Sequence, residues 1–266
     1  MSATSSLLSA RLSAGYPNRP DVLNGLELEI APGEIIGLVG ESGSGKSTLA
    51  LALLRLLEFR GGRVRGELCF RGRNLLDLSP RQMRAVRGRD IALVLQSPLS
   101  ALNPAMRIGS QIQEAWRAHS EQSSDLLEAL ATVNLPAEES FLERYPSEIS
   151  VGQAQRVLIA MAILHRPALL IADESTSALD AVTQSEILKL FTRLNRQMGM
   201  AVLYISHDLL SVASFCQRIA ILRTGQIVET NCTEEIFSAP RHPYTKALLG
   251  AIPKLPEPAA LLGLAN

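Results

Sequence analysis

The residues best suited to chemistry lie between two apolar stretches near the start of the chain. Glycines and small polar residues lead into a lysine and two hydroxyl residues, in the pattern G-x-x-x-x-G-K followed by Ser or Thr. Because glycines adopt backbone conformations that other residues avoid, successive N–H groups can converge on one anion. The pattern predicts a phosphate-binding loop (P-loop) made of Gly40, Glu41, Ser42, Gly43, Ser44, Gly45, Lys46, Ser47 and Thr48.

Two side chains of this loop have specific predicted roles. Lys46 can reach the β- and γ-phosphates of a nucleotide, and the Ser47 hydroxyl can ligate Mg²⁺. The apolar run 49–57 is rich in helix formers, and a helix there would direct its positive end at the same phosphates. The chain has no N-K-x-D guanine-reading sequence, which argues against a GTPase.

Four further polar side chains follow apolar runs typical of buried strands: Gln96, Asp173, Glu174 and His207. In α/β folds nucleotides bind at the carboxyl ends of the strands, so these side chains should meet there. We expect Asp173 to hold Mg²⁺ through its water shell and Glu174 to orient or deprotonate the attacking water. Gln96 could ligate Mg²⁺ and touch that water, and His207 could reach a γ-phosphate.

The elements that must position these side chains follow from the apolar pattern. Residues 1–95 predict antiparallel strands together with the P-loop, and 96–156, rich in helix formers, predict an inserted helical subdomain. Residues 157–240 alternate helix and strand, as in a mostly parallel sheet, and 241–266 form a proline-marked tail. The expected fold is α/β: a P-loop NTPase core with an antiparallel β subdomain and the helical insertion.

Composition narrows the possible partners. The chain has 26 basic and 26 acidic residues among 266, which argues against bulk electrostatic binding to nucleic acid, because such binding needs a basic face. Its three cysteines have no metal-binding spacing. No apolar run approaches the length of a membrane span, so we expect a soluble, intracellular protein whose membrane role, if any, comes through a partner.

The order of the motifs resembles that of the ATP-binding subunit of an ABC transporter. The resemblance covers about residues 10 to 250 and rests on Tyr16, the P-loop, Gln96, ISVGQ (149–153), LLIADE (169–174), SALD (177–180) and His207. It implies ATP and Mg²⁺ as cofactors, with Tyr16 stacking on adenine. Such subunits work in pairs, so Ser150, Gly152, Gln153 and Asp180 would complete the ATP site of a second subunit.

The resemblance also implies partners and a location. They are a second ABC ATPase, distinct or identical, two transmembrane permease subunits and, indirectly, a substrate-binding protein. The chain would sit on the cytoplasmic face of the inner (plasma) membrane, with residues 98–106 as the surface that meets a permease.

Residues 96–114 and 241–253 are similar to segments of the oligopeptide, dipeptide and nickel importer branch. The first reading is therefore the energy-coupling subunit of such an importer. Two alternatives stay open: a soluble ABC-type ATPase without a transporter, for example in carbon–phosphorus bond metabolism, and a hydrolytically weak regulatory subunit.

Val151 departs from the family pattern, which has glycine at this position of ISVGQ. A stiff, β-branched residue is costly where φ is positive or the backbone must lie against a ligand. This predicts an asymmetric heterodimer whose second ATP site, completed by Val151, turns over slowly. The alternative is a loop with β-type angles at 151 that accepts valine.

Overall fold

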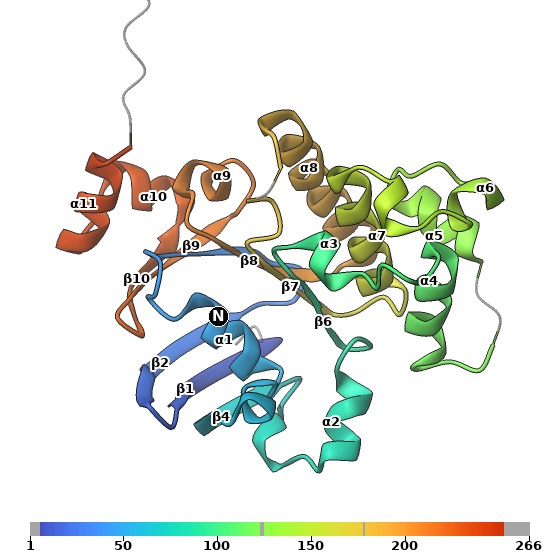
Figure 1. Cartoon of the computed structure of the whole chain (residues 1–266). Coiled ribbons are helices and arrows are strands. Elements are labelled where there is room, and N and C mark those ends of the chain that lie inside the picture. The colour runs from blue at the N-terminus through green and yellow to red at the C-terminus, as the bar shows by residue number, and fades with distance from the viewer. Residues whose placement is uncertain (1–5, 123–124, 178, 253–266) are drawn as a thin grey trace, which may run out of the picture.

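The computed structural model describes residues 6–122, 125–177 and 179–252 (Figure 1). Their strands form a four-stranded sheet in the order β2-β1-β4-β5 and a six-stranded sheet in the order β10-β9-β3-β8-β7-β6. The strands are β1 (Leu8–Tyr16), β2 (Arg19–Ile30), β3 (Ile35–Val39), β4 (Arg63–Phe70), β5 (Arg73–Asn74), β6 (Ile91–Val94), β7 (Leu169–Asp173), β8 (Ala201–Ser206), β9 (Arg218–Arg223) and β10 (Gln226–Cys232).

The four-stranded sheet is antiparallel and has one buried face. β1 pairs with both β2 and β4, and along it Leu8, Ala10 and Leu12 are buried while Arg11 is exposed. This alternation is typical of a sheet with one face on the core. The buried face shares a core with helix α1 (Lys46–Leu53), which carries the end of the P-loop.

The six-stranded sheet is mostly parallel, and its inner strands β3, β7 and β8 are buried on both faces. β3 lies between β8 and β9 and runs parallel to both, whereas β10 is antiparallel to β9. Ile36 and Leu38 face the core shared with β1 and α1, and Ile35 and Val39 face the core of the long helices. Burial on both faces explains why β3 is a continuous apolar run.

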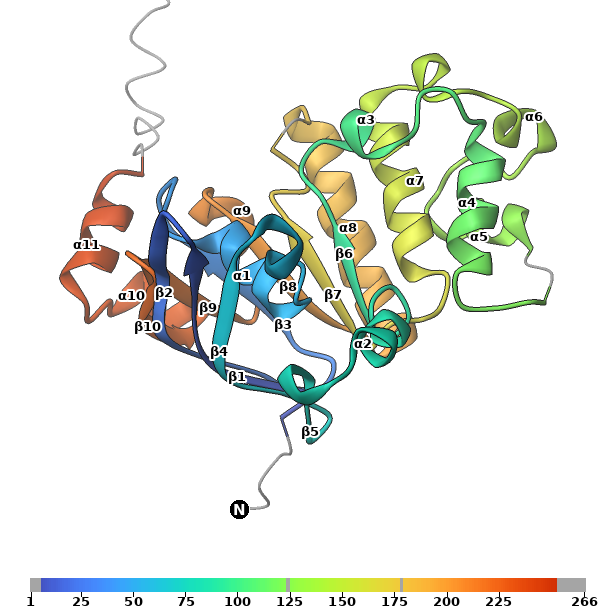
Figure 2. The same cartoon turned by 60° about the horizontal axis from the view of Figure 1, so that its bottom comes forward.

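Helices connect these sheets and cover them. Helices α3 to α8 lie on one side of the molecule, and α10 and α11 lie at the opposite end (Figures 1 and 2). The α-helices besides α1 are α2 (Pro80–Val86), α3 (Pro98–Ala101), α4 (Ile108–Arg117), α5 (Leu126–Thr132), α6 (Glu139–Leu142), α7 (Val151–Ile163), α8 (Ala181–Met198), α9 (Leu209–Ala213), α10 (Thr233–Ser238) and α11 (Pro243–Gly250). The 3-10 turns are η1 (Leu57–Arg60), η2 (Leu75–Asp77) and η3 (Pro146–Glu148).

The expected fold class is confirmed, with local differences. The helix after the P-loop begins at Lys46 and ends at Leu53, four residues before the end of the apolar run. α7 continues through position 156, where the sequence suggested a domain boundary, so the four-part division stays a prediction. Residues 253–266 of the predicted tail lie outside the described residues. Among the helices of the described ranges, none is long and apolar enough to cross a membrane.

Candidate functional site

The P-loop connects β3 to α1 and presents the start of that helix. Gly45 is the N-cap of α1 and has a φ of 111°. A side chain at this φ would be strained, and its Cβ would lie 2.8 Å from the Leu23 Cδ2 atom. No side chain caps the helix, so the N–H groups of its first turn remain available to an anion.

Lys46 is held inside this loop. Its side chain is only 5% exposed, and Nζ donates to the carbonyl oxygens of Gly40 at 2.8 Å and Glu41 at 3.0 Å. Burial lowers the pKa of Lys46, and the negative charges of Glu174 and Asp173 oppose that decrease. Nζ lies 3.8 Å from Glu174 Oε1, so the loop and the strand-end carboxylates form one site.

Asp173 ends β7 and is buried beside the P-loop. Its Oδ1 has no hydrogen-bond partner among the residues that the structure describes. Burial raises the pKa of Asp173, and the Ser47 hydroxyl opposes this by hydrogen bonding to the carboxylate. A buried carboxylate oxygen without a partner, beside a hydroxyl, fits a hard cation or its water shell. Ser47 and Asp173 therefore fit Mg²⁺.

Glu174 lies at the centre of the predicted catalytic residues. Its backbone is in the left-handed region at φ 46°, which is uncommon for a residue other than glycine and frequent at functional sites. Gln96 Nε2 donates to Glu174 Oε2 at 3.1 Å and to Ser177 Oγ at 3.1 Å. His207 Nδ1 lies 3.5 Å from Glu174 Oε1. The ends of β6, β7 and β8 thus bring the three predicted catalytic side chains together.

A pocket of about 480 Å³ opens over the P-loop, Gln96 and Glu174, and His207 and Asp173 do not line it; its volume is within the size range of small-molecule sites. Tyr16, at the end of β1, forms part of its wall, where an aromatic ring could stack on a base. Arg19 and Val22 also line it, and sequence reasoning missed both. The feature that could have revealed Arg19 is the tight turn after β1, which pairs Tyr16 with Arg19. The other lining residues are Ser42, Gly43, Gly45, Lys46, Ser47, Thr48, Gln96 and Glu174.

The ISVGQ segment forms the start of α7 and is not part of that pocket wall. Ser150 is the N-cap, and its Oγ accepts from the Gln153 N–H at 3.2 Å while the Gln153 side chain accepts from the Ser150 N–H at 3.0 Å. Such a capping box fixes the helix start. The polar groups of both residues therefore stabilise α7 within the described chain.

Val151 has neither the positive φ nor the β-type angles considered for it, whereas contact of its backbone with a ligand stays a prediction. Val151 is the first residue of α7 and does not have a positive φ. β-type angles occur one residue earlier, at Ser150, with φ −69° and ψ 160°. A valine is accommodated there because the first helical turn leaves its side chain 38% exposed. The Val151 side chain itself adds apolar bulk to the surface at the start of α7.

Gly152 and Asp180 meet where α7 approaches α8. A Cβ on Gly152 would lie 2.8 Å from the Thr183 Cγ2 methyl group, so the packing of α7 on α8 favours glycine here. Asp180 is the N-cap of α8 and accepts hydrogen bonds from the Val182 and Thr183 N–H groups. A hydrogen bond from the Thr183 hydroxyl, together with these backbone bonds, lowers the pKa of Asp180.

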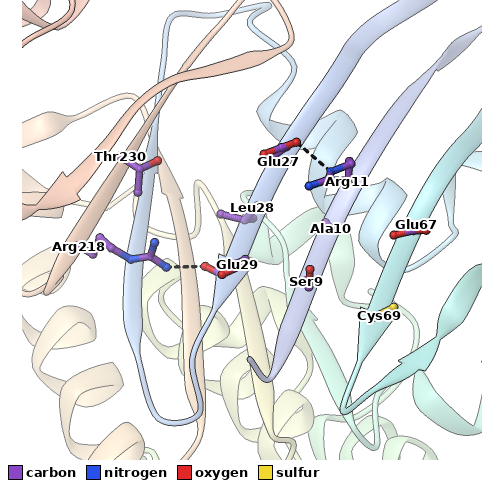
Figure 3. Close-up of a pocket in the computed structure, with 10 residues that line it drawn as sticks. All are labelled: Ser9, Ala10, Arg11, Glu27, Leu28, Glu29, Glu67, Cys69, Arg218 and Thr230. Atoms are coloured by element: carbon purple, nitrogen blue, oxygen red, sulfur yellow. Dashed lines mark hydrogen bonds and ion pairs between the residues drawn. The ribbon is translucent and has the colours of Figure 1, made fainter. Parts of the chain in front are cut away.

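A second depression, of about 290 Å³, lies on the exposed face of the antiparallel sheet (Figure 3). Arg11 Nε lies 2.9 Å from Glu27 Oε1 across its floor, and Arg218 donates to the Glu29 carbonyl oxygen and pairs with Glu34. Both arginines therefore already have partners, so the depression offers no free cationic group for an anion, whereas the Glu29 and Glu67 carboxylates that also line it form no ion pair among the described residues.

Comparison with known proteins assigns the chain to a class. Residues 23–177 match the family described as "ABC transporter", and residues 228–265 match "Oligopeptide/dipeptide transporter, C-terminal region". The chain is 46% identical over 237 residues to the "Probable peptide ABC transporter ATP-binding protein y4tR" of Sinorhizobium fredii. The matched region covers 87% of this chain and 71% of that protein. The chain belongs to the family of ABC transporter ATP-binding proteins.

Other relatives are longer than this chain. The "Glutathione import ATP-binding protein GsiA" of Salmonella choleraesuis is 46% identical over 246 residues, which is 88% of this chain and 40% of that protein. The GsiA of Escherichia coli O157:H7 is 46% identical over 241 residues, or 86% of this chain and 39% of that protein. The chain thus spans well under half the length of these relatives.

Solved structures give the same class. The ATP-binding cassette MJ0796, in a dimeric post-hydrolysis state bound to ADP and Pi, superposes with a TM-score of 0.74 at 26% identity and covers 85% of this chain and 98% of that one. The cassette cbiO1 from Clostridium perfringens, at 24% identity, has a TM-score of 0.76 and supports the fold alone; it covers 88% of this chain and 91% of that one. The fold is therefore that of an ABC cassette.

Proposed function

We propose that this chain binds ATP with Mg²⁺ in the pocket above the P-loop and hydrolyses it to power an importer of peptides. One observation carries the proposal. Glu174 lies within 3.8 Å of Lys46, accepts a hydrogen bond from Gln96 at 3.1 Å, and has His207 at 3.5 Å. A carboxylate between a phosphate-reading lysine and two polar side chains is suited to orient and deprotonate a water molecule.

Each side chain of the site has a proposed task. Lys46 and the first N–H groups of α1 bind the phosphates, and the ring of Tyr16 stacks on adenine. Ser47, Asp173 and Gln96 would hold Mg²⁺, which supplies charge neutralisation to the phosphates when bound. Glu174 accepts the proton of the attacking water. His207 contacts the γ-phosphate from the end of β8.

The likeness to a dimeric cassette supports a paired arrangement. In such a pair the surface at the start of α7, with Ser150, Gly152 and Gln153, and the start of α8, with Asp180, faces the ATP of the second subunit. Val151 adds a half-exposed apolar side chain to that surface. We keep the proposal of an asymmetric pair, and base it on the bulk of this side chain rather than on backbone strain.

Peptides are the proposed substrate class because the C-terminal match and the peptide and glutathione relatives all point to them. The C-terminal match and the relatives named above do not favour nickel, a soluble ATPase without a transporter, or a hydrolytically weak regulatory subunit. Two permease subunits and a substrate-binding protein are the proposed partners, at the cytoplasmic face of the membrane. We also retain the division into residues 1–95, 96–156, 157–240 and 241–266.

Reconstitution tests this proposal. The chain is combined in lipid vesicles with a second ATPase, permeases and a binding protein from the same genome, and ATP hydrolysis is measured with short peptides, with glutathione and with Ni²⁺. We expect peptide or glutathione to raise the rate and Ni²⁺ to leave it unchanged. Stimulation by Ni²⁺ alone would overturn the substrate class, and hydrolysis indifferent to all three would overturn the coupling to import.

A further inference from the structure

Helix α11 contacts the P-loop directly, although the two segments are about 200 residues apart in the sequence. Tyr244 is the second residue of α11 and is only 7% exposed. Its hydroxyl oxygen accepts a hydrogen bond from the Glu41 N–H at 3.2 Å. Tyr244 lies within the region that matches the oligopeptide/dipeptide transporter C-terminal family.

This hydrogen bond fixes a peptide group that also holds the P-loop lysine. The Glu41 N–H and the Gly40 carbonyl belong to one planar peptide unit. The Gly40 carbonyl accepts from Lys46 Nζ at 2.8 Å, while the N–H at its other end donates to Tyr244. A hydrogen bond at one end of a peptide group strengthens the bond at the other, so Tyr244 and Lys46 are linked through this unit.

Tyr244 is itself held in place. The His242 Nδ1 atom accepts from the Tyr244 N–H at 3.1 Å, and the Glu229 carboxylate accepts from the N–H groups of Arg241 at 2.8 Å and His242 at 3.0 Å. The Arg223 guanidinium lies 4.9 Å from the centre of the Tyr244 ring, within cation–π range. The start of α11 is therefore fixed to β9 and β10 on two sides.

The turn between β9 and β10 makes a second contact with the same loop. The Gly225 N–H, in this turn, donates to the Ser44 carbonyl oxygen at 2.9 Å. Arg223 ends β9 beside this turn and stacks on Tyr244. The β9–β10 turn and α11 thus hold the outer side of the P-loop at two points, Ser44 and Glu41.

We propose that Tyr244 is a positioning residue that pre-orients the P-loop, and with it Lys46, for nucleotide. The proposal rests on the proposed binding of ATP at this loop. Because the energetic coupling of two sites is reciprocal, nucleotide bound at the P-loop also stabilises the docked position of α11. The C-terminal region of this branch thereby acts on the affinity of the ATP site.

Tyr244→Phe tests the proposal because it keeps the ring on Arg223 and removes only the hydroxyl. We expect the Kd for ATP to rise about three- to tenfold, as for loss of one positioning hydrogen bond. The turnover at saturating ATP should stay within about twofold, since the catalytic groups are untouched. In the nucleotide-free protein, hydrogen exchange at the Glu41 amide should become faster.

Lys246→Ala is the matched control. Lys246 lies two residues after Tyr244 on α11 and is exposed, and its side chain makes no hydrogen bond or ion pair among the described residues. The control should change neither the Kd nor exchange at Glu41. Unchanged Kd and Glu41 exchange in Tyr244→Phe would overturn the inference, as would an equal effect of Lys246→Ala. A parent protein that does not bind ATP would instead overturn the proposed function on which the inference rests.

Discussion

Replacing Lys46 with alanine should weaken ATP binding far more than it weakens the fold. The Lys46 side chain is 5% exposed and its ammonium is close to two carboxylates, so its contact with phosphate forms away from bulk water. A hydrogen bond to a charged group contributes roughly 1.5–3 kcal/mol. At about 1.4 kcal/mol per tenfold, the Kd for ATP should rise roughly 10- to 150-fold in Lys46→Ala.

Titration of a fluorescent ATP analogue against the full chain measures this change. Lys189→Ala is the matched control, because Lys189 is exposed on α8 and is absent from the pocket lining. The control should bind like the parent protein. If Lys46→Ala binds as tightly as the parent, the P-loop is not the nucleotide site and the account of the pocket is wrong.

Three further predictions follow from the packing and charge of the site. Gly152→Ala should lower the free energy of unfolding, measured in urea, by about 1–3 kcal/mol because its Cβ meets the Thr183 methyl group. Adding Thr183→Ser, which removes that methyl but keeps the hydroxyl, should restore most of the loss. If it does not, the contact with Thr183 does not limit position 152. Burial raises the pKa of Asp173, so the folded state binds a proton more readily than the unfolded chain and stability falls as pH rises through the interval between the two pKa values. Asp173→Asn should therefore raise the Tm of the Mg²⁺-free protein at neutral pH, by about 2–4 °C per kcal/mol gained, and a lower Tm would contradict the burial argument. Val151→Gly in the reconstituted pair should raise ATP turnover at the second subunit's site. Mutating each P-loop lysine in turn isolates the turnover of one site. No change at either site would remove the case for asymmetry.

The sequence could predict the parts of the site that are local or lie at strand ends. The P-loop is one contiguous motif, so its glycines and Lys46 were found without knowing the fold. Gln96, Glu174 and His207 are far apart in sequence, but each follows an apolar strand, and parallel strands end at one edge. Their contacts, Gln96 to Glu174 at 3.1 Å and His207 to Glu174 at 3.5 Å, follow from that geometry.

The helix start at Val151 was missed although a local pattern encodes it: Ser150 and Gln153 have the S-x-x-Q spacing of a capping box, which starts α7 at Val151. Other features depended on tertiary contacts that no local pattern encodes. The reason for glycine at 152 is the Thr183 methyl on another helix. The bond between Tyr244 and Glu41 joins residues 203 positions apart, and only the folded chain reveals it.

Glu174→Gln tests the central claim, that Glu174 activates water at an ATP site, most directly. The substitution keeps the size of the side chain and its contact with Gln96 but removes the base. Steady-state ATP hydrolysis and ATP binding are measured side by side on the full chain, paired with its partner ATPase. We expect turnover at this chain's site to fall about 10²- to 10⁴-fold while the Kd for ATP stays within about twofold. Hydrolysis at the parent rate with unchanged binding would contradict the account.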